Sequence, residues 1–310
     1  MIWLLLLAAA PQAGVDLSSE VSAAIAARTT RGDEAFFSTI QALVDRDDAS
    51  AMELLGEIYM MGGFGRESDP AKACKLFAKA AGRRGDSAHN LARCYELGNG
   101  FAADPVKARQ WYRQAAEAGY AKSNCALGNL MVSGTGGPRD VPGGIALCRR
   151  AADAGVADAQ TDLGNFLLAG TGGRRDMVEA RKWYTLAAEQ NQANAQFVLG
   201  QIYWKGDGTP VDRAAAVKWW KLSYAGGRKD AAGLIVGGLL KNMVIERDGQ
   251  KTVDRSLVPE TLTWLELNTK FSAEWPNITR KKDSPADADE HKGEEGKYDK
   301  YFSAEPGEGD

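Results

Sequence analysis

A leucine, or once an isoleucine, returns every 36 residues through the middle of the chain, and this spacing constrains the fold more than any other feature. The positions are Leu55, Leu91, Leu127, Leu163, Leu199 and Ile235. Such a period is typical of repeat proteins, in which each unit buries its apolar surface against its neighbours. The sequence therefore predicts one small unit written five to six times and stacked into an array.

The first half of each unit has the pattern of a short helix that packs closely against another helix. A small residue stands four positions before the recurring leucine, as Ser87 does before Leu91, so both lie on one helical face. The residue directly after the leucine is small as well, at Gly56, Ala92, Gly128, Gly164 and Gly200. Glycine costs up to about 1 kcal/mol relative to alanine inside a helix. We therefore expect a second helix to approach closely at this position.

A glycine-rich turn and a second helix complete each unit. The second helix begins at an aspartate, which is a preferred N-cap residue. These aspartates are Asp69, Asp104, Asp140, Asp176 and Asp212. Pro70 and Pro105 follow at the first helical position, where a missing N–H costs nothing. Large pairs such as Trp183 and Tyr184 then precede small residues, and we interpret these aromatic residues as core.

The repeat resembles a known family. Residues 108–119 read Ala-Arg-Gln-Trp-Tyr-Arg-Gln-Ala-Ala-Glu-Ala-Gly, and Leu-Gly pairs at 163–164 and 199–200 precede glycine-rich turns. This text is similar to the Sel1-like repeat family over roughly residues 51–240. The resemblance implies an all-α fold, a right-handed α/α superhelix (solenoid) related in shape to tetratricopeptide arrays, with five to six 36-residue helix hairpins and a cap at each end. Because members of the family serve as adaptors, it also implies protein–protein interaction, without naming a partner.

The flanks of the array divide the chain further. We expect a signal peptide at 1–13, an N-terminal helical cap at 14–50, the repeat array at 51–240, a C-terminal capping segment at 241–282 and an acidic disordered tail at 283–310. The first 15 residues carry no charge and include an apolar run that ends in small residues, as signal peptides do. The run is shorter than the about 20 residues needed to cross a bilayer. The sequence thus predicts a periplasmic or secreted protein without a stable membrane span in the mature chain, or a cytoplasmic one if the start site is misassigned.

Charge is concentrated in the tail. Residues 283–310 hold ten acidic and three basic side chains, a net charge of −7, whereas the whole chain carries −3. Such a composition is typical of disordered segments. The remainder is too close to neutral to predict a nucleic-acid surface.

The four cysteines allow two interpretations. Cys74 could pair with Cys94, and Cys125 with Cys148, but none stands in a CxxC or Cys/His metal spacing. Buried free thiols are the interpretation we favour from the sequence. We expect neither a metal nor a cofactor.

Catalytic motifs are missing from the sequence. His89 and His291 are its histidines, and neither a Ser-x-x-Lys nor an HExxH motif occurs. We therefore predict that the protein is not an enzyme. Two alternatives stay open: an envelope hydrolase of the cysteine-rich, β-lactamase-like branch of the family, and a carbohydrate-associated envelope scaffold.

A row of polar residues is the candidate binding site. By resemblance to tetratricopeptide arrays, the first helices line a concave surface and the residue two places after the recurring leucine points into the groove. This row is Glu57, Arg93, Asn129, Asn165 and Gln201, with His89 and Thr161 one turn earlier and Glu96 and Trp204 one turn later. Amides both donate and accept hydrogen bonds, so the row could bind an extended peptide backbone; the alternative is the solvated face of amphipathic helices. We predict a non-catalytic adaptor that binds a protein or peptide there.

Overall fold

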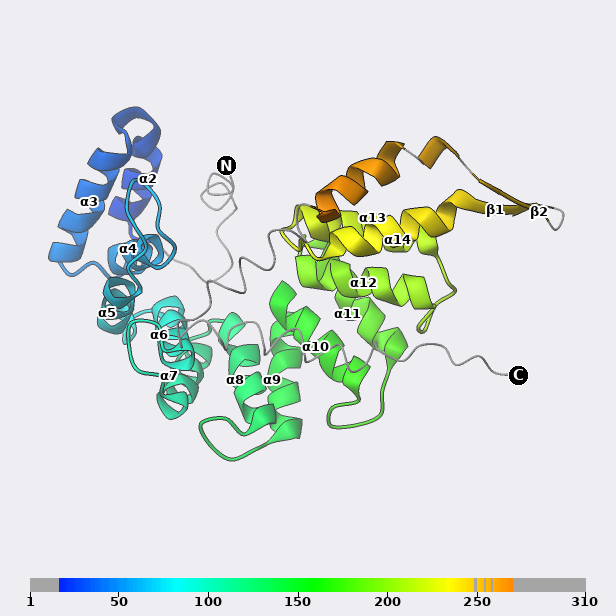
Figure 1. The fold of residues 1–310 in the computed structure, drawn as a ribbon. Coiled ribbons are helices and arrows are strands. Elements are labelled where there is room, and N and C mark those ends of the chain that lie inside the picture. The colour runs from blue at the N-terminus through cyan, green and yellow to red at the C-terminus, as the bar shows by residue number, and fades with distance from the viewer. Residues whose placement is uncertain (1–16, 248–249, 254, 258, 270–310) are drawn as a thin grey trace. The chain divides into compact units, whose positions relative to one another are not determined.

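The computed structural model describes residues 17–247, 250–253, 255–257 and 259–269 (Figure 1). The predicted signal peptide and acidic tail lie outside the described residues. The chain divides into two compact units, Met1–Ala195 and Gln196–Asp310, and each is described by itself.

The first unit is a run of helix pairs, each joined by a short turn (Figure 1). The two helices predicted ahead of the repeats are α2 (Ser19–Arg31) and α3 (Asp33–Asp45). The repeat hairpins follow as α4 (Ala49–Met61) with α5 (Pro70–Ala80), α6 (Gly85–Leu97) with α7 (Pro105–Glu117), α8 (Lys122–Ser133) with α9 (Val141–Asp153), and α10 (Ala157–Ala169) with α11 (Met177–Glu189). The predicted all-α fold of repeated helix hairpins is confirmed.

The second unit contains most of α12 (Ala193–Lys205), then α13 (Arg213–Ala225) and α14 (Ala231–Met243). An antiparallel pair of short strands follows, β1 (Val244–Arg247) and β2 (Gln250–Val253), with Val244 opposite Val253. A 3₁₀ turn (Arg255–Leu257) leads to a helix at 259–269. The strand pair was not predicted, although β-branched residues flank an Asp-Gly pair at 248–249, which is a hairpin signal.

Local signals fix where the repeat helices begin and end. Each predicted N-cap aspartate accepts a hydrogen bond from the backbone N–H three residues later, as Asp104 does from Lys107 at 3.0 Å and Asp176 from Glu179 at 2.8 Å. The helices α6, α8 and α10 end at left-handed glycines. The N-cap prediction is therefore confirmed in all five second helices.

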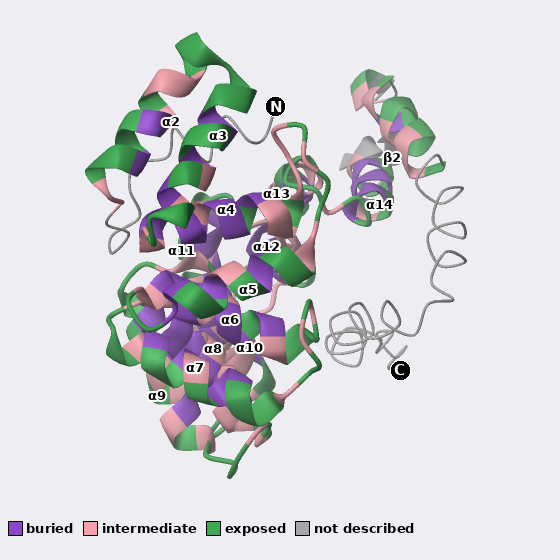
Figure 2. Ribbon diagram, turned by 90° about the vertical axis from the view of Figure 1, so that its left-hand side faces the viewer, coloured by how far each residue is buried: buried purple, intermediate pink, exposed green. Residues whose placement is uncertain are grey.

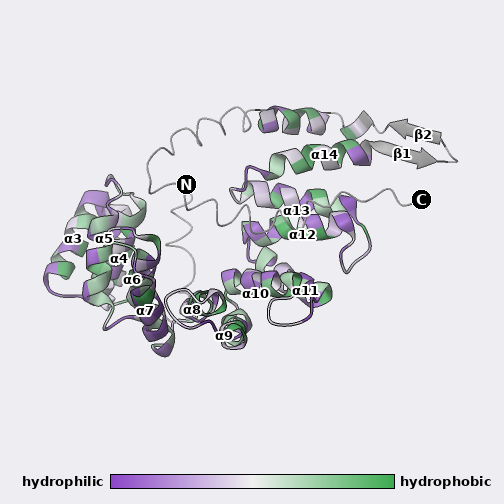
Figure 3. Ribbon diagram, turned by 60° about the horizontal axis from the view of Figure 1, so that its bottom comes forward, coloured by the Kyte–Doolittle hydropathy of each residue, from purple (hydrophilic) through white to green (hydrophobic). Residues whose placement is uncertain are grey.

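The small residue after the recurring leucine accommodates an aromatic ring from the second helix. A Cβ added at Gly56 would lie 2.4 Å from the ring of Phe77, and one at Gly164 would lie 2.9 Å from that of Tyr184. Both rings are buried, as predicted for the core. Figure 2 shows buried residues where helices of a pair face each other, and Figure 3 shows apolar and polar residues alternating along the same helices. The close helix approach expected from the glycines is thus confirmed.

The hairpin α8–α9 departs from this plan. Cys148 stands where the other second helices have an aromatic residue, and a Cβ on Gly128 would lie 2.4 Å from the carbonyl oxygen of Gly144. The two backbones therefore touch directly, and a disulfide joins Cys125 to Cys148 across them.

A second disulfide joins Cys74 of α5 to Cys94 of α6, which belong to successive hairpins. All four cysteines are paired, so the structure contradicts the free thiols that we favoured from the sequence. The spacing along the chain could not show that each pair comes together across a helix contact. Within the described residues, no helix combines the length and apolar character needed to cross a bilayer.

Candidate functional site on the first helices

The polar row predicted from the sequence lies on α4, α6, α8 and α10, and we call the surface that carries it the first-helix face. Glu57 and Arg93 are exposed there, whereas Asn129 and Asn165 are half-buried. Side-chain hydrogen bonds link each of these helices to the next first helix, so the row belongs to one continuous surface of the first unit.

The link between α4 and α6 is a buried carboxyl group. Glu53 is 4% exposed and accepts hydrogen bonds from the Ser87 hydroxyl and, at 2.6 Å, from the Asn90 amide. Burial, together with the negative charge of Asp86, raises the pKa of Glu53 to about 8. The carboxyl is therefore mostly neutral at pH 7, which removes the cost of burying a charge.

A guanidinium faces Asp86 at the start of α6. Arg84 contacts both carboxylate oxygens, at 2.9 Å and 2.6 Å, and its third nitrogen donates to the Ser50 hydroxyl at 2.7 Å. Such a bidentate pair is strong and geometrically specific. It fixes the start of α6 against α4.

The link between α6 and α8 is His89. Its Nδ1 lies 2.9 Å from the Ser123 hydroxyl, and its ring packs between Tyr112 and Tyr120, each 5.2 Å away between centroids. Burial, with the positive charges of Arg93 and Lys122, lowers the pKa of His89 to about 3. The imidazole is thus neutral at physiological pH and serves as a packed hydrogen-bonding group.

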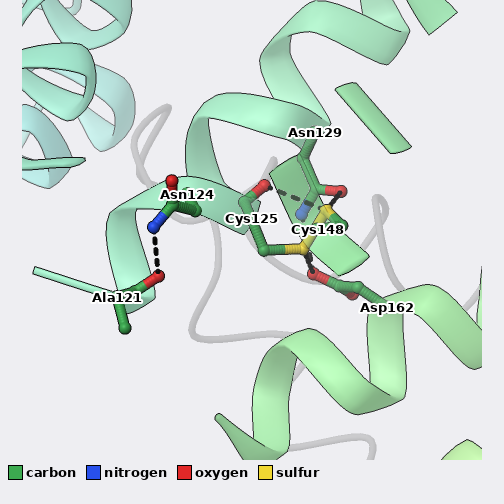
Figure 4. The surroundings of a disulfide bond; sticks show 6 residues. All are labelled: Ala121, Asn124, Cys125, Asn129, Cys148 and Asp162. Carbon is green, nitrogen blue, oxygen red and sulfur yellow. Dashed lines mark hydrogen bonds between the residues drawn. A yellow bond between two sulfur atoms is a disulfide. The ribbon is translucent and has the colours of Figure 1, made fainter. Parts of the chain in front are cut away.

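The link between α8 and α10 is Asn129. Its amide donates to Asp162 at 2.7 Å, and Figure 4 shows its side chain beside the Cys125–Cys148 bridge. The Cys125 sulfur lies 3.5 Å from a carboxylate oxygen of Asp162. The disulfide therefore forms part of the support beneath the polar row.

Tyrosines of the second helices donate hydrogen bonds to two further predicted residues. The Tyr112 hydroxyl donates to Glu96 at 2.5 Å, and the Tyr184 hydroxyl donates to Asn165 at 2.7 Å. Burial and the negative charge of Glu96 raise the pKa of Tyr112, which keeps the hydroxyl a donor. Both polar side chains are positioned by the same rings that fill the hairpin core.

Two exposed charges complete the face. The pKa of Glu57 is raised because neighbouring protein desolvates the carboxylate and Asp86 repels it. Among the described residues, Arg93 has no ion-pair or hydrogen-bond partner. A guanidinium presented in this way can bind a carboxylate or several carbonyl oxygens of a ligand.

Of the remaining predicted residues, Thr161 does not offer a free group on this face. Thr161 is buried and donates its hydroxyl to the Ala157 carbonyl of its own helix at 3.0 Å. Gln201 and Trp204 belong to the second unit. There Trp204 is half-buried and packs against Trp220, with ring centroids 5.6 Å apart. Its indole therefore packs against the core of that unit.

Sequence reasoning missed the residues that connect the helices. Glu53 stands 36 residues before His89, so it shares a register of the predicted row, and the 36-residue period was the available signal for it. Asp86 and Asp162 lie outside the registers of that row. A hollow of about 740 Å³ lies elsewhere in the first unit, lined by Tyr59, Arg66, Lys72 and 98–100. It contains none of the predicted residues.

The repeated hairpins and their shared hydrogen bonds define an α/α solenoid. The Sel1 repeat model matches residues 49–83, 85–120, 121–156, 157–192 and 193–227, more than half of the chain. The chain belongs to the Sel1 repeat family, as the sequence resemblance indicated.

Solved structures agree with this assignment. A Sel1 repeat protein from Oxalobacter formigenes is 28% identical, with a TM-score of 0.63, and the match covers 81% of this chain and 97% of that one. The protective antigen c5321 of uropathogenic Escherichia coli, described as having an SLR fold, is 21% identical with a TM-score of 0.57, over 81% of this chain and 53% of that one. The second match supports the fold alone.

Two further similarities are found, and one of them is located in the C-terminal region. Residues 263–303 match a domain of unknown function, DUF3470. Ferredoxin-1 of Caulobacter vibrioides is 48% identical over 46 residues, which cover 15% of this chain and 41% of the ferredoxin. The last cysteine of this chain is Cys148, so the DUF3470 region brings no thiolate ligand for an iron–sulfur cluster.

Proposed function

We propose that the protein is a non-catalytic adaptor that binds an extended protein segment on the first-helix face. The observation that carries the proposal is the row of side chains that Glu53, His89 and Asn129 hold in register from helix to helix. The fold is consistent with a protein-interaction adaptor, since Sel1 repeats typically mediate protein interactions. A row with a fixed spacing suits the repeating carbonyl and amide groups of an extended peptide.

Preorganisation favours binding at this surface. Asn129 and Asn165 are already held by Asp162 and Tyr184, so a ligand would not have to immobilise them. Fixing a free side chain costs about 0.5–1.5 kcal/mol, and this cost is largely met by folding. Arg93 adds an exposed guanidinium that forms no ion pair with another described residue.

A charge-reversal pair tests the surface. A photo-crosslinking amino acid at Glu57 should capture a partner in the native compartment, and Arg93→Glu should abolish capture. Arg113 is the matched control, because it is an exposed arginine on α7, the other helix of the same hairpin. Capture that survives Arg93→Glu, or that is lost equally with Arg113→Glu, would contradict the proposal.

The amides give a second test. Asn129→Asp together with Asn165→Asp should weaken capture, because a carboxylate cannot donate to a peptide carbonyl and Asn129→Asp also repels Asp162. Unchanged affinity would remove these residues from the binding site.

We further propose that the protein acts outside the cytoplasm. Two buried disulfides support this location, because disulfides persist in oxidising compartments and are rare in reducing ones. Cells denatured directly in a thiol-alkylating reagent should yield this protein with all four cysteines unmodified, and fractionation should place the protein in the envelope or medium. Four alkylated cysteines after this denaturing step would contradict this location.

A further inference from the structure

Two cationic side chains of the first-helix face lie near the ring of His89. The ring packs against Tyr120 with 5.2 Å between centroids, and its Nδ1 lies 2.9 Å from the Ser123 hydroxyl near the start of α8. Arg93 stands four residues after His89, so both lie on one face of α6. Lys122 directly precedes Ser123 and is the first residue of α8. We call Arg93, Lys122 and Tyr120 the basic subsite.

The charges of the basic subsite reach groups on neighbouring helices. Burial is the main cause of the lowered pKa of His89, and the charges of Arg93 and Lys122 lower it further. Burial raises the pKa of Tyr120, and Arg93 opposes this rise. Desolvation raises the pKa of Glu57 on α4, and Lys122 on α8 opposes that rise. Arg93 and Lys122 thus create one positive region that extends across α6.

The donors of the basic subsite are unpaired in the described part of the chain. Neither Arg93 nor Lys122 forms an ion pair or a hydrogen bond with another described residue, and the Tyr120 hydroxyl forms no hydrogen bond with one. Guanidinium and ammonium groups only donate hydrogen bonds, and a phenol can donate one as well. Three neighbouring donors, two of them charged, are therefore available to an acceptor.

The acidic groups around the basic subsite do not neutralise it directly. Asp86 is paired with Arg84, and Glu96 accepts the hydrogen bond of the Tyr112 hydroxyl. Glu57 belongs to α4 and forms no ion pair with a described residue. The row continues on α8 and α10 with uncharged amides. The positive charge of the row is therefore concentrated between α6 and α8.

A carboxylate is the acceptor that suits this set of donors. It offers two oxygens that only accept hydrogen bonds, together with the compensating negative charge. Hydrogen bonds between charged groups are about twice as strong as those between neutral groups, so a backbone carbonyl would bind more weakly here. In a protein segment, a carboxylate comes from an aspartate or glutamate side chain or from the chain terminus.

We propose that the extended segment bound on the first-helix face carries an aspartate or glutamate whose side chain binds in the basic subsite. The inference rests on the proposed function and adds the position at which the partner is selected by charge. An internal residue fits the face, because the polar row continues on both sides of the subsite, to Glu57 on α4 and to Asn165 on α10. A chain terminus at this point would leave one side of the row without a ligand.

Selection from a displayed library of random peptides tests the charge preference. Peptides of about ten residues span about 33 Å when extended, which is enough to cross four helices spaced by about 8–10 Å. Those selected on the full-length wild type should share an aspartate or glutamate at one position. Arg93→Glu with Lys122→Glu should change the residue selected there to lysine or arginine. Because the changed preference requires a folded binding face, it cannot arise from unfolding.

The matched control is Arg113→Glu with Lys182→Glu. It changes the net charge equally, at exposed residues of the second helices α7 and α11, and should keep the acidic preference. Loss of the acidic preference in this control would show that the overall charge of the protein selects the peptides, and would overturn the inference.

The other outcomes separate this inference from the proposed function. Peptides that lose binding with Asn129→Asp plus Asn165→Asp, but share no acidic position, would overturn the inference and leave the adaptor surface in place. The same holds if the acidic preference survives Arg93→Glu with Lys122→Glu. If no peptide binds on the first-helix face, both the inference and the proposed function are overturned.

A selected peptide then identifies the source of the carboxylate. Replacing its acidic residue by the corresponding amide should weaken binding to the wild type about tenfold, as expected for the loss of a charge-assisted hydrogen bond. The same replacement should have little effect on binding to Arg93→Ala with Lys122→Ala, in which the donors are absent. Amidation of the peptide's C-terminus should leave the affinity unchanged. A tenfold loss on amidation would place a chain terminus in the subsite and overturn the internal assignment.

Discussion

The third and fourth hairpins solve the same packing problem in different ways. In α10–α11 the ring of Tyr184 fills the space above Gly164, and its hydroxyl holds Asn165. In α8–α9 the aromatic position is Cys148, Gly128 touches the backbone of Gly144, and a disulfide crosses the contact. The comparison shows that a repeat can keep its outline while replacing a buried ring by direct backbone contact and a covalent bond.

Removing the ring should have the largest effect. Tyr184→Ala leaves a cavity where the fourth hairpin has its main core residue, and we expect a loss of about 4 kcal/mol in unfolding free energy. Tyr184→Phe, the control, should cost only about 1 kcal/mol, because it removes just the hydrogen bond to Asn165. Urea unfolding followed by circular dichroism measures both. Equal losses would mean that the hydroxyl, and not the ring, stabilises this hairpin.

Replacing glycine by alanine at the helix contact should lower stability by different amounts in the two hairpins. A Cβ at Gly128 meets a backbone oxygen that cannot move alone, so Gly128→Ala should cost about 3 kcal/mol. At Gly164 the obstacle is a side-chain ring that can shift, and alanine gains up to about 1 kcal/mol of helix propensity. The second hairpin already pairs Ala92 with Tyr112 in this arrangement. Gly164→Ala should therefore lower the unfolding free energy by less than about 1 kcal/mol. Urea unfolding measures both variants, and equal losses for Gly128→Ala and Gly164→Ala would contradict this prediction.

The disulfide of the third hairpin should supply stability that a buried aromatic ring supplies in the fourth. Cys125→Ala with Cys148→Ala should lower stability by about 2–3 kcal/mol, as expected for closing a loop across a sequence separation of 23. Cys74→Ala with Cys94→Ala is the control, with a separation of 20 but a bridge between hairpins. Thermal melts with and without dithiothreitol measure both variants. A third variant, with all four cysteines replaced by alanine, should be insensitive to dithiothreitol. If its stability still falls in the reductant, the loss does not come from the disulfides.

The sequence predicted the features that depend on local interactions. The 36-residue period, the N-cap aspartates and the small residue after each leucine depend on neighbours within one or two turns, and they predicted the hairpins and their ring-filled cores. The disulfides depend on which helices meet, which spacing alone does not give, although the 36-residue register already placed Cys148 among aromatic residues.

The candidate site was predicted less completely for the same reason. The residue two positions after each leucine is exposed at Glu57 and Arg93 and half-buried at Asn129 and Asn165. Thr161 and Trp204 sit one turn away, where a small rotation decides between packing and exposure, and both are engaged in their own units. Glu53, which connects α4 to α6, occupies the same position in its repeat as Cys125 does in the third hairpin. Its role could have been predicted only by expecting a charged residue to be buried at that position.

The smallest expected effect on stability comes from Glu53, which extends the comparison to the first hairpin. Burial raises the pKa of Glu53 to about 8, so the folded state retains a proton that the unfolded chain releases near its ordinary pKa. The resulting stabilisation is complete below the unfolded pKa and is lost as pH rises toward 8. One proton gives a slope of at most about 1.4 kcal/mol per pH unit.

The window from pH 6.5 to 8 isolates this group. His89, whose folded pKa is lowered to about 3, changes stability by only about 0.4 kcal/mol across this window and in the opposite direction, because its unfolded imidazole releases its proton near pH 6.5. Urea unfolding of the wild type should therefore show stability falling from pH 6.5 to 8, and Glu53→Gln should flatten the slope. Cys125→Ala, at the same register in α8, should leave the slope unchanged because no carboxyl titrates there. A wild-type slope that persists in Glu53→Gln would mean that another group, such as Glu57, takes up the proton, and that the buried carboxyl is held charged by Ser87 and Asn90.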